Sequence, residues 1–236
     1  MLTIIVPVFN EKKFIRRILK KIIKITNVRK QIIIVDDGST DGTSQILRQE
    51  FKKLKIINKI IFHKSNQGKG AAIKSAQKFI KGDYVGIQDA DLEYNPKDLI
   101  KIYHYIKKNK FDVVYGSRVL NKNKYQNTQN FTHFVRIFGN AFLTYISNVI
   151  NKQNLSDAHT CYKVFDSKIF KNIKLSENDF AFCPEITSKI SKLKLNIVEI
   201  GISYTGRSVE EGKKIGIIDG FRAILVLLKY GLFGIK

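Results

Sequence analysis

Acidic side chains at two-residue spacing are the residues of this chain best suited to chemistry. Asp89, Asp91 and Glu93 follow the apolar run at residues 85–88. If that run is a strand that ends in a loop, alternate side chains point the same way and the three carboxylates converge on one point. A hard divalent cation is held by one or two carboxylates, with water and substrate phosphates in its other positions. The spacing therefore predicts a metal site, although an isolated Asp-X-Asp more often belongs to a solvated acidic loop.

Three further polar motifs follow apolar runs, and each has a structural and a functional interpretation. Glu11 fits the first turn of a helix, where acids are favourable, or a ligand role. In the pair Asp36-Asp37, one residue fits a turn or cap, and the other could accept a hydrogen bond from a base or ribose. Gly68-Lys69-Gly70 at a helix start suits an anion. The Walker and dinucleotide-binding fingerprints do not occur in the sequence, so neither a P-loop ATPase nor a Rossmann dehydrogenase is supported.

Cationic side chains in the second half offer a second kind of site. Arg207 precedes Lys213 and Lys214, and Arg118 follows a strand-like run. Because Arg supplies a planar fork of donors and Lys a mobile point charge, these residues could together clamp phosphates. The structural alternative is a charged surface loop.

Strand-like and helix-like segments alternate over the first 116 residues. Predicted strands cover residues 2–8, 31–35, 56–62, 84–88 and 111–115, and predicted helices follow each of the first four. This alternation predicts an α/β fold with a mostly parallel, Rossmann-like sheet covered by helices on both faces. Such sheets bind ligands beyond the carboxyl ends of their strands. Since every acidic or glycine motif above follows a predicted strand, we expect a single site there.

The second half is less regular and ends in an apolar tail. We expect a long helix at 131–151, a strand at 160–165, a helix around 182–193 and a strand around 196–204. Arg222 and Lys229 interrupt the tail at 215–235, so it does not reach the ~18 apolar residues that a spanning helix needs. The tail fits either an amphipathic helix in a membrane interface or a helix packed on the core.

Composition narrows the class of partner. The formal net charge is +22, from 42 Lys and Arg against 20 Asp and Glu. Such an excess suits nucleic acid or an anionic membrane surface. A nucleic-acid module should also interleave Arg with aromatic residues or carry a docking motif; we find neither and expect no nucleic-acid partner. Only two cysteines are present, so we expect no disulfide framework and a reducing compartment.

Taken together, the motifs resemble those of family 2 inverting glycosyltransferases with the GT-A fold, and within them the polyprenyl-phosphate glycosyltransferases of the dolichyl-phosphate mannose synthase group. They follow the expected order along nearly the whole chain, at residues 7–11, 35–43, 66–72, 88–93, 116–118, 157–163, 184–187 and 204–215. The resemblance implies a GT-A catalytic domain at 1–212, with a nucleotide-sugar half (1–118) and an acceptor half (119–212). An amphipathic, membrane-interfacial helix would follow at 213–236.

The resemblance also implies roles for individual residues. Asp37 would face the nucleotide base, and Mg²⁺ or Mn²⁺ on the diphosphate would be held by Asp89, Asp91 and Glu93. The full set expected to bind the donor comprises Pro7, Phe9, Glu11, Asp37, Lys69, Asp89 and Asp91. The residues expected to act in catalysis, several of them on the acceptor phosphate or the leaving group, are Asp91, Arg118, Arg207, Lys213, Lys214 and Glu185. Phe9 stands where the family usually has Tyr, and His159 where relatives often have an acid.

The implied reaction moves a sugar from a nucleotide sugar (GDP-mannose or a UDP-sugar) to polyprenyl or dolichyl phosphate. The enzyme would lie in the cytoplasm, peripheral on the inner face of the cytoplasmic membrane, at an anionic surface and with or without a membrane-anchoring partner protein. The alternatives are transfer to a sugar hydroxyl in glycan or polysaccharide assembly, a nucleotidyltransferase, and a non-catalytic basic module. A hydroxyl acceptor would need a carboxylate base, for which Glu93 and Glu185 are candidates.

Overall fold

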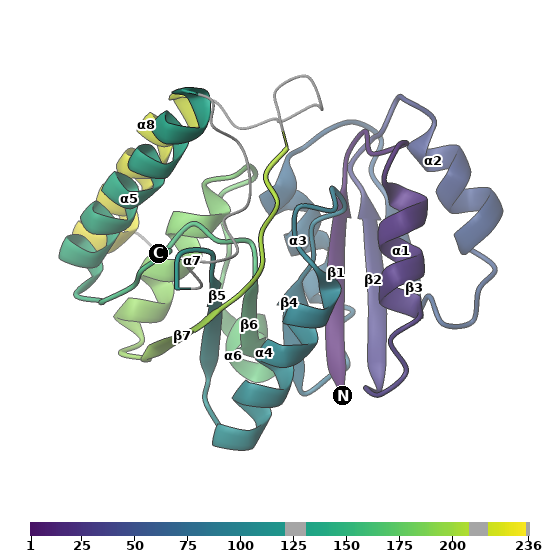
Figure 1. Cartoon of the computed structure of the whole chain (residues 1–236), viewed down its shortest axis with the longest axis horizontal. Coiled ribbons are helices and arrows are strands. Elements are labelled where there is room, and N and C mark those ends of the chain that lie inside the picture. The colour runs from purple at the N-terminus through teal and green to yellow at the C-terminus, as the bar shows by residue number, and fades with distance from the viewer. Residues whose placement is uncertain (121–130, 208–216, 235–236) are drawn as a thin grey trace.

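The computed structural model describes residues 1–120, 131–207 and 217–234, which form a seven-stranded sheet with helices around it (Figure 1). The strands lie in the order β3-β2-β1-β4-β6-β5-β7. Their bounds are β1 (Leu2–Val8), β2 (Lys30–Asp36), β3 (Lys59–Phe62), β4 (Tyr84–Ile87), β5 (Val113–Ser117), β6 (Lys163–Asp166) and β7 (Ile197–Gly201). The helices are α1 (Ile15–Ile23), α2 (Thr43–Ile46), α3 (Lys69–Gln77), α4 (Pro96–Asn109), α5 (Phe131–Asn151), α6 (Ser167–Asn172), α7 (Phe182–Lys192) and α8 (Ile217–Leu227), with π-helical turns η1 (Leu47–Phe51) and η3 (Leu228–Leu232).

The sheet is mostly parallel, which confirms the prediction from the alternating pattern. Strand β1 pairs in parallel with β2 and β4, β2 with β3, and β5 with β7. Strand β6 runs antiparallel between β4 and β5. Parallel strands covered on both faces are apolar along their length, and Leu2, Ile4 and Ile5 of β1 are accordingly all buried.

Helices cover both faces of the sheet. Figure 1 places α1 and α4 in front of the strands, and α3 and α6 behind them. Helix α1 buries a stripe at helical spacing that includes Ile15, Ile18 and Ile22. Helix α4 begins at Pro96, and the side chain of Asn95 accepts a hydrogen bond from the Lys97 N–H, so this start has both signals expected of a helix N-terminus.

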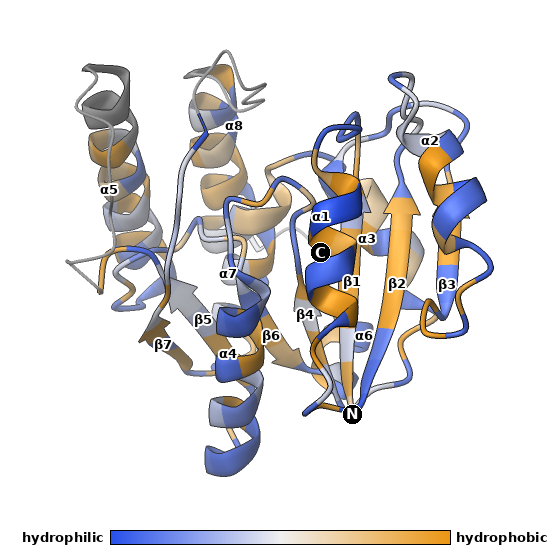
Figure 2. Cartoon of the chain, turned by 45° about the vertical axis from the view of Figure 1, so that its right-hand side comes forward, coloured by the Kyte–Doolittle hydropathy of each residue, from blue (hydrophilic) through white to orange (hydrophobic). Residues whose placement is uncertain are grey.

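The second half adds a group of three helices, α5, α7 and α8, that contact one another at one end of the sheet. Helices α5 and α8 lie side by side, with their outer sides facing away from the strands (Figures 1 and 2). Within the described part of the chain, no helix is long and apolar enough to cross a membrane.

Several elements begin later than the sequence predicts, because side chains and turns take up the first residues. The helix expected from Glu11 starts at Ile15, since the Glu11 carbonyl accepts hydrogen bonds from the N–H groups of Phe14 and Ile15 in a preceding turn. The strand expected from residue 160 starts at Lys163. The sequence analysis did not predict helix α6, although the Asp166 carboxylate caps it by accepting from Lys168 and Ile169.

Candidate active site

The predicted site residues gather where the parallel strands end. Strands β1, β2 and β4 run the same way, so Glu11, Asp37 and Asp89 leave the sheet at one edge. Because β6 is antiparallel, it begins at this edge and brings the segment before Lys163, including Cys161, to the same place. The prediction of one site at the carboxyl ends of the strands agrees with this arrangement.

Of the three acids after β4, Asp91 and Glu93 both approach the Arg207 guanidinium, at 3.2 and 3.8 Å, while Asp89 pairs with Lys69; joint metal binding by the three remains a prediction. Leu92 adopts a left-handed backbone conformation (φ 64°), and the Asp91 carboxylate accepts the Glu93 N–H at 3.1 Å. This turn breaks the strand alternation on which the expectation rested. Among the described residues, no group of three or more His, Cys, Asp or Glu side chains is arranged to hold a metal ion.

Asp89 is paired with Lys69 at the start of α3. The Lys69 ammonium lies 2.6 Å from Asp89 Oδ1, and 3.5 Å from Cys161 Sγ. Both charged side chains are largely buried. Burial disfavours the charge on Lys69, but the Asp89 carboxylate outweighs it and keeps the pKa of Lys69 well above its ordinary value. The two side chains therefore form an ion pair that keeps Lys69 in its charged form.

Arg207 supplies a second cation to the acids. Its Nη2 lies 3.2 Å from Asp91 Oδ2, and its Nη1 lies 3.2 Å from Glu11 Oε2. Burial and the neighbouring carboxylates of Asp89 and Glu93 raise the pKa of Asp91 to about 7, while Arg207 acts in the opposite direction. Lys69 and Arg207 thus offset the negative charge of the acids Glu11, Asp89 and Asp91.

Glu93 forms several hydrogen bonds to the segment that contains Arg207, and its role as a metal ligand remains a prediction. Its Oε1 accepts the Arg207 backbone N–H at 2.8 Å, and its Oε2 accepts the Tyr204 hydroxyl at 2.8 Å. Its carbonyl accepts the Thr205 N–H, and Tyr94 beside it forms a β-bridge with Tyr204. Because both carboxylate oxygens face segment 204–207, we assign Glu93 to holding that segment beside the acids.

The Asp37 carboxylate is 2% exposed and accepts four hydrogen bonds. Its Oδ1 faces His63 Nδ1 at 2.6 Å and the Gln67 N–H at 3.0 Å. Its Oδ2 accepts from Asn66 Nδ2 at 2.9 Å and the Gly68 N–H at 2.7 Å. These bonds fix the loop that leads into α3 and so position Lys69. Contact with the nucleotide base, the role implied by resemblance, remains a prediction for Asp37.

The two glycines of Gly68-Lys69-Gly70 allow another loop to pack tightly against the start of α3. A Cβ on either glycine would collide with backbone oxygens of the 177–178 segment, and Gly68 has φ +99°, which favours glycine. The Ala71 N–H donates to the Asn178 carbonyl at 2.9 Å. One of the donors at this helix start is therefore already used by the protein, and the motif presents Lys69 as its charged group.

Arg118 belongs to a buried network at the end of β5. Its Nε and Nη2 lie 2.6 and 2.7 Å from the two oxygens of Asp157, a bidentate pair. Asn140 bonds to both partners, and the guanidinium lies 5.2 Å from the Tyr204 ring centre. Burial opposes ionisation of Asp157, but the Arg118 charge prevails and lowers its pKa. Within the described residues, this guanidinium donates its hydrogen bonds through Nε and Nη2, which leaves Nη1 for a ligand.

Glu185 has a structural environment that differs from the catalytic role the sequence suggested. Its side chain is fully buried in α7, and its carboxylate accepts the N–H groups of Ser176 and Glu177 at 2.6 and 2.9 Å. Lys189 pairs with it at 2.8 Å. With both oxygens engaged, the carboxylate holds the loop that covers the start of α3, and we assign it to that loop.

Some of the remaining predicted residues lie in the described part of the chain and others do not. Pro7 and Phe9 lie at the end of β1 and are half-buried. Lys213 and Lys214 lie outside the described residues. The sequence analysis did not single out His63, whose Nε2 lies 2.9 Å from Ser75 Oγ while its Nδ1 faces Asp37. Nothing local marks it, because it joins Asp37 only once β2 and β3 pair.

The donor set at the strand ends fits a hard divalent cation. Asp89 and Asp91 each present carboxylate oxygens, and in this structure Lys69 and Arg207 balance their negative charge. Mg²⁺ and Mn²⁺ favour oxygen ligands, and Mg²⁺ is typically bound through one or two carboxylates together with substrate phosphates. Two acids are therefore sufficient, and the structure offers two.

The arrangement matches a known class of enzyme. The fold is similar to that of a glucosyl-3-phosphoglycerate synthase from Mycobacterium tuberculosis, with a TM-score of 0.72, 12% identity, and coverage of 98% of this chain and 80% of that one. The same synthase in complex with Mn²⁺ and UDP-glucose gives a TM-score of 0.69 at 14% identity. The fold is thus that of the GT-A glycosyltransferases.

Residues 3–174 match the model of glycosyl transferase family 2, and the chain belongs to this family. It is a glycosyltransferase, which favours sugar transfer over the nucleotidyl-transfer and non-catalytic alternatives. An uncharacterized protein of Methanocaldococcus jannaschii is 30% identical over 98% of this chain and 92% of its own length. The UDP-N-acetylglucosamine–dolichyl-phosphate N-acetylglucosaminyltransferase of Methanococcus voltae is 27% identical, over 98% and 97%. A dolichyl-phosphate beta-glucosyltransferase of Trichomonas vaginalis is also 27% identical, over 97% and 72%.

Proposed function

We propose that this enzyme transfers a sugar from a nucleotide sugar to the phosphate of a polyprenyl or dolichyl carrier, with inversion, at a membrane surface. Two relatives named for dolichyl-phosphate acceptors align with almost the whole chain, including its acceptor half. The observation that carries the proposal is an apolar surface on α5, α8 and η3, where large apolar side chains stand exposed.

The donor side rests on the acids after β1 and β4. Asp89 and Asp91 would hold Mg²⁺ or Mn²⁺, and the bound cation would neutralise the diphosphate of the donor. Pro7, Phe9 and Glu11 lie at the end of β1, at the same edge of the sheet, and would border the nucleotide. Lys69, held at this edge by Asp89, adds a fixed positive charge for the leaving group. The structurally similar synthase was crystallised with Mn²⁺ and UDP-glucose, which supports a metal-dependent donor site.

The acceptor side rests on Arg118 and Arg207. Arg118 is fixed by Asp157 and keeps Nη1 for a ligand, and Arg207 lies beside the acids and precedes α8 in the sequence. Guanidinium groups bind phosphate oxygens through paired hydrogen bonds. They would draw the carrier phosphate toward the sugar against the repulsion between two anions. Lys213 and Lys214 are proposed to add to this charge.

The reaction needs little proton transfer. An oxygen of the carrier phosphate attacks the anomeric carbon, the bond from that carbon to the diphosphate oxygen breaks, and nucleoside diphosphate leaves with the bonding electrons. Because the attacking oxygen is already anionic, no strong general base is required. The residues around it have to orient the two substrates and stabilise the charge on the leaving group. That agrees with a site in which Glu93 and Glu185 are engaged in holding loops.

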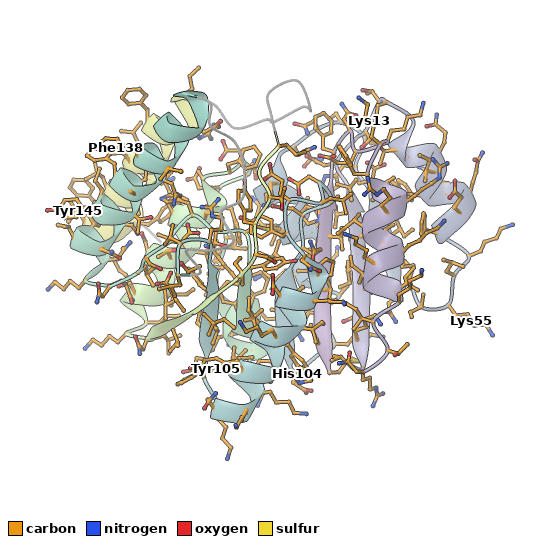
Figure 3. The ribbon with its side chains drawn as sticks, in the orientation of Figure 1. Lys13, Lys55, His104, Tyr105, Phe138 and Tyr145 are labelled. Atoms are coloured by element: carbon orange, nitrogen blue, oxygen red, sulfur yellow. The ribbon has the colours of Figure 1, made fainter. Side chains whose placement is uncertain are left out.

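The apolar surface would contact the membrane that contains the polyprenyl or dolichyl carrier. It consists of the exposed apolar side chains Ile137, Phe138, Phe142, Tyr145 and Val149 of α5, Ile218, Phe221 and Leu225 of α8, Leu232 of η3, and Phe233. Phe138 and Tyr145 point outward from α5 (Figure 3), and Ile218 is 82% exposed. Large exposed apolar side chains on helices that contact one another are typical of an interaction site, and aromatic rings suit the bilayer interface. We propose that it lies on the inner, anionic face of the cytoplasmic membrane, with or without an anchoring protein.

An acceptor panel tests the proposal. Purified enzyme is incubated with GDP-mannose and several UDP-sugars, Mg²⁺ or Mn²⁺, and either polyprenyl phosphate in detergent, free saccharides, or no acceptor. We expect release of nucleoside diphosphate to require the lipid phosphate and to identify the donor. Release that instead requires a free saccharide would contradict the lipid acceptor and would point to transfer onto a hydroxyl group.

A further inference from the structure

Arg207 contacts carboxylates from two separate loops at once. Its guanidinium reaches Glu11 after β1 and Asp91 after β4, with N–O distances of 3.2 Å to each, and its Nε lies 3.8 Å from Glu93 Oε1. The side chain is only 12% exposed and lies over the Phe14 ring, 5.3 Å from its centre. A planar cation that gathers carboxylates in this way does the electrostatic work that a bound metal ion would otherwise do at the same place.

The contact engages the ligand atoms that a metal would need. Asp91 Oδ2 faces Arg207, and Asp91 Oδ1 accepts the Glu93 N–H. A divalent cation on Asp91 would stand within a few ångströms of the guanidinium, and two positive charges at that separation repel each other strongly in a buried site. The Arg207 guanidinium and a metal ion therefore compete for Asp91, and each weakens the binding of the other.

The backbone beside Arg207 is held separately from its side chain. The Arg207 N–H donates to Glu93 Oε1, the Thr205 N–H donates to the Glu93 carbonyl, and Tyr204 donates its hydroxyl to Glu93 Oε2. The guanidinium can thus leave Asp91 while its Cα stays in place beside the acids. It would then be available to an acceptor phosphate that approaches the acids.

We propose that Arg207 is a resident counter-ion that a divalent cation must displace from Asp91, and that displacement turns the guanidinium toward the substrate phosphates. This inference rests on the proposed function, which requires a metal ion. It extends that function by proposing that Arg207 occupies Asp91 first and that the metal ion then replaces it. Free enzyme holds Arg207 on the acids and binds metal weakly. Metal that arrives with a donor diphosphate brings negative charge that offsets its own, so the exchange costs less, and the released guanidinium becomes available to the acceptor phosphate.

Binding of Mn²⁺ alone tests the competition without any sugar or lipid. Electron paramagnetic resonance of free Mn²⁺ gives the dissociation constant for wild type, Arg207→Gln, Arg207→Lys and Arg16→Gln. Arg16 is the matched control, because it also forms a bidentate pair with a carboxylate, Glu50, but at an exposed surface of α1. Its replacement removes the same charge without touching the acids.

We expect Arg207→Gln to bind Mn²⁺ at least roughly tenfold more tightly than wild type, since close charge pairs are coupled by that much or more. Arg207→Lys, which keeps the charge without the planar fork, should fall between them, and Arg16→Gln should match wild type. Equal or weaker binding by Arg207→Gln would overturn the inference, as would the absence of Mn²⁺ binding in every variant. If Arg207→Gln fails to fold, Arg207→Lys decides: affinity no higher than that of wild type counts against competition.

The outcome is distinguishable from failure of the proposed function. A variant series that shows the expected order of Mn²⁺ affinities supports the counter-ion even if polyprenyl phosphate is not the acceptor. Lipid-dependent transfer together with unchanged Mn²⁺ affinity in Arg207→Gln would support the function and refute the counter-ion.

Discussion

Removal of the charge on Asp157 should destabilise the protein because it leaves Arg118 buried without its counter-ion. The Asp157 side chain is fully buried, that of Arg118 is 14% exposed, and two charge-assisted hydrogen bonds of 2.6 and 2.7 Å join them. Removing one partner of a buried ion pair costs about 3–5 kcal/mol. For a domain of this size each kcal/mol lowers Tm by roughly 2–4 °C. We therefore expect Asp157→Asn to unfold on the order of 10 °C below wild type.

The stability lost in Asp157→Asn should decrease as the pH falls and should not change at higher pH. The pKa of Asp157 is lower in the folded protein than its ordinary value, because Arg118 outweighs the cost of burial. Its contribution to the free energy of unfolding is fully present above the pKa of the unfolded chain, roughly 3.9, and is lost as pH falls through the lower folded value. The stability difference between wild type and Asp157→Asn should be constant above about pH 5 and should shrink as the solution is acidified further.

A thermal melt followed by circular dichroism at pH 7 measures the Tm difference, and urea unfolding at pH 7 and at a series of lower pH values measures the free-energy difference and its pH dependence. The matched control is Glu50→Gln, which breaks a bidentate pair with Arg16 at the protein surface, where such pairs contribute little. We expect the control to unfold close to wild type. A loss below about 1 kcal/mol for Asp157→Asn would refute the reasoning, since it would place the pair among solvent-screened surface pairs.

Three further outcomes follow from the site and the apolar surface. Asp91→Asn should abolish turnover while leaving the fold intact by circular dichroism, and full metal-dependent activity in it would remove Asp91 from the site. Arg207→Ala should reduce transfer more than it weakens donor binding measured by calorimetry; equal losses would place Arg207 on the donor side. The double replacement Phe138→Ser and Tyr145→Ser should lower cosedimentation with anionic vesicles several-fold, by analogy with the roughly 1.5–3 kcal/mol for burying a large apolar side chain. The control Tyr105→Ser, on α4, should bind vesicles like wild type, and equal binding by the double variant would contradict the membrane contact.

The sheet and the place of the site could be predicted from the sequence because both depend on local patterns. Apolar runs alternating with helical spacing indicate parallel strands under helices, and parallel strands bring the residues that follow them to one edge. Asp89, Asp91 and Lys69 lie at that edge for this reason. The position of Arg207 beside Asp91 was not predicted: the sequence indicated Arg207 as part of a phosphate clamp, and nothing in the spacing of two residues so far apart in the chain places it at the acids.

The individual partners could not be predicted, because they depend on turns and on contacts distant in sequence. Leu92 has a left-handed backbone conformation, and the Glu93 carboxylate accepts the Tyr204 hydroxyl from a segment more than 100 residues away in sequence. Glu185 carries an acidic motif that suggested chemistry, but its oxygens meet the backbone of the preceding loop. Asp37 was expected at the base, and the four donors around its carboxylate become neighbours only when β2, β3 and the start of α3 assemble.

The exposed surface of α5 shows a further limit of sequence reading. The pattern predicted a long helix at 131–151, which the structure contains as α5, but not which face would remain uncovered. Only the packing of α5 against α7 and α8 reveals that Phe138, Phe142 and Tyr145 point outward. The sequence analysis considered a membrane contact for the tail alone; the structure adds α5 as a second helix to be tested.

The most direct test of the central claim is the formation of a lipid-linked sugar. Wild-type enzyme and Asp91→Asn are given the donor selected by the acceptor panel, labelled in its sugar, with polyprenyl phosphate and Mg²⁺ or Mn²⁺, and the label is followed into organic solvent. We predict that wild type transfers label to the organic phase only when the lipid phosphate and the metal are both present, and that Asp91→Asn does not. Label that stays in the aqueous phase with wild type, while nucleoside diphosphate is still released, would contradict a polyprenyl-phosphate acceptor.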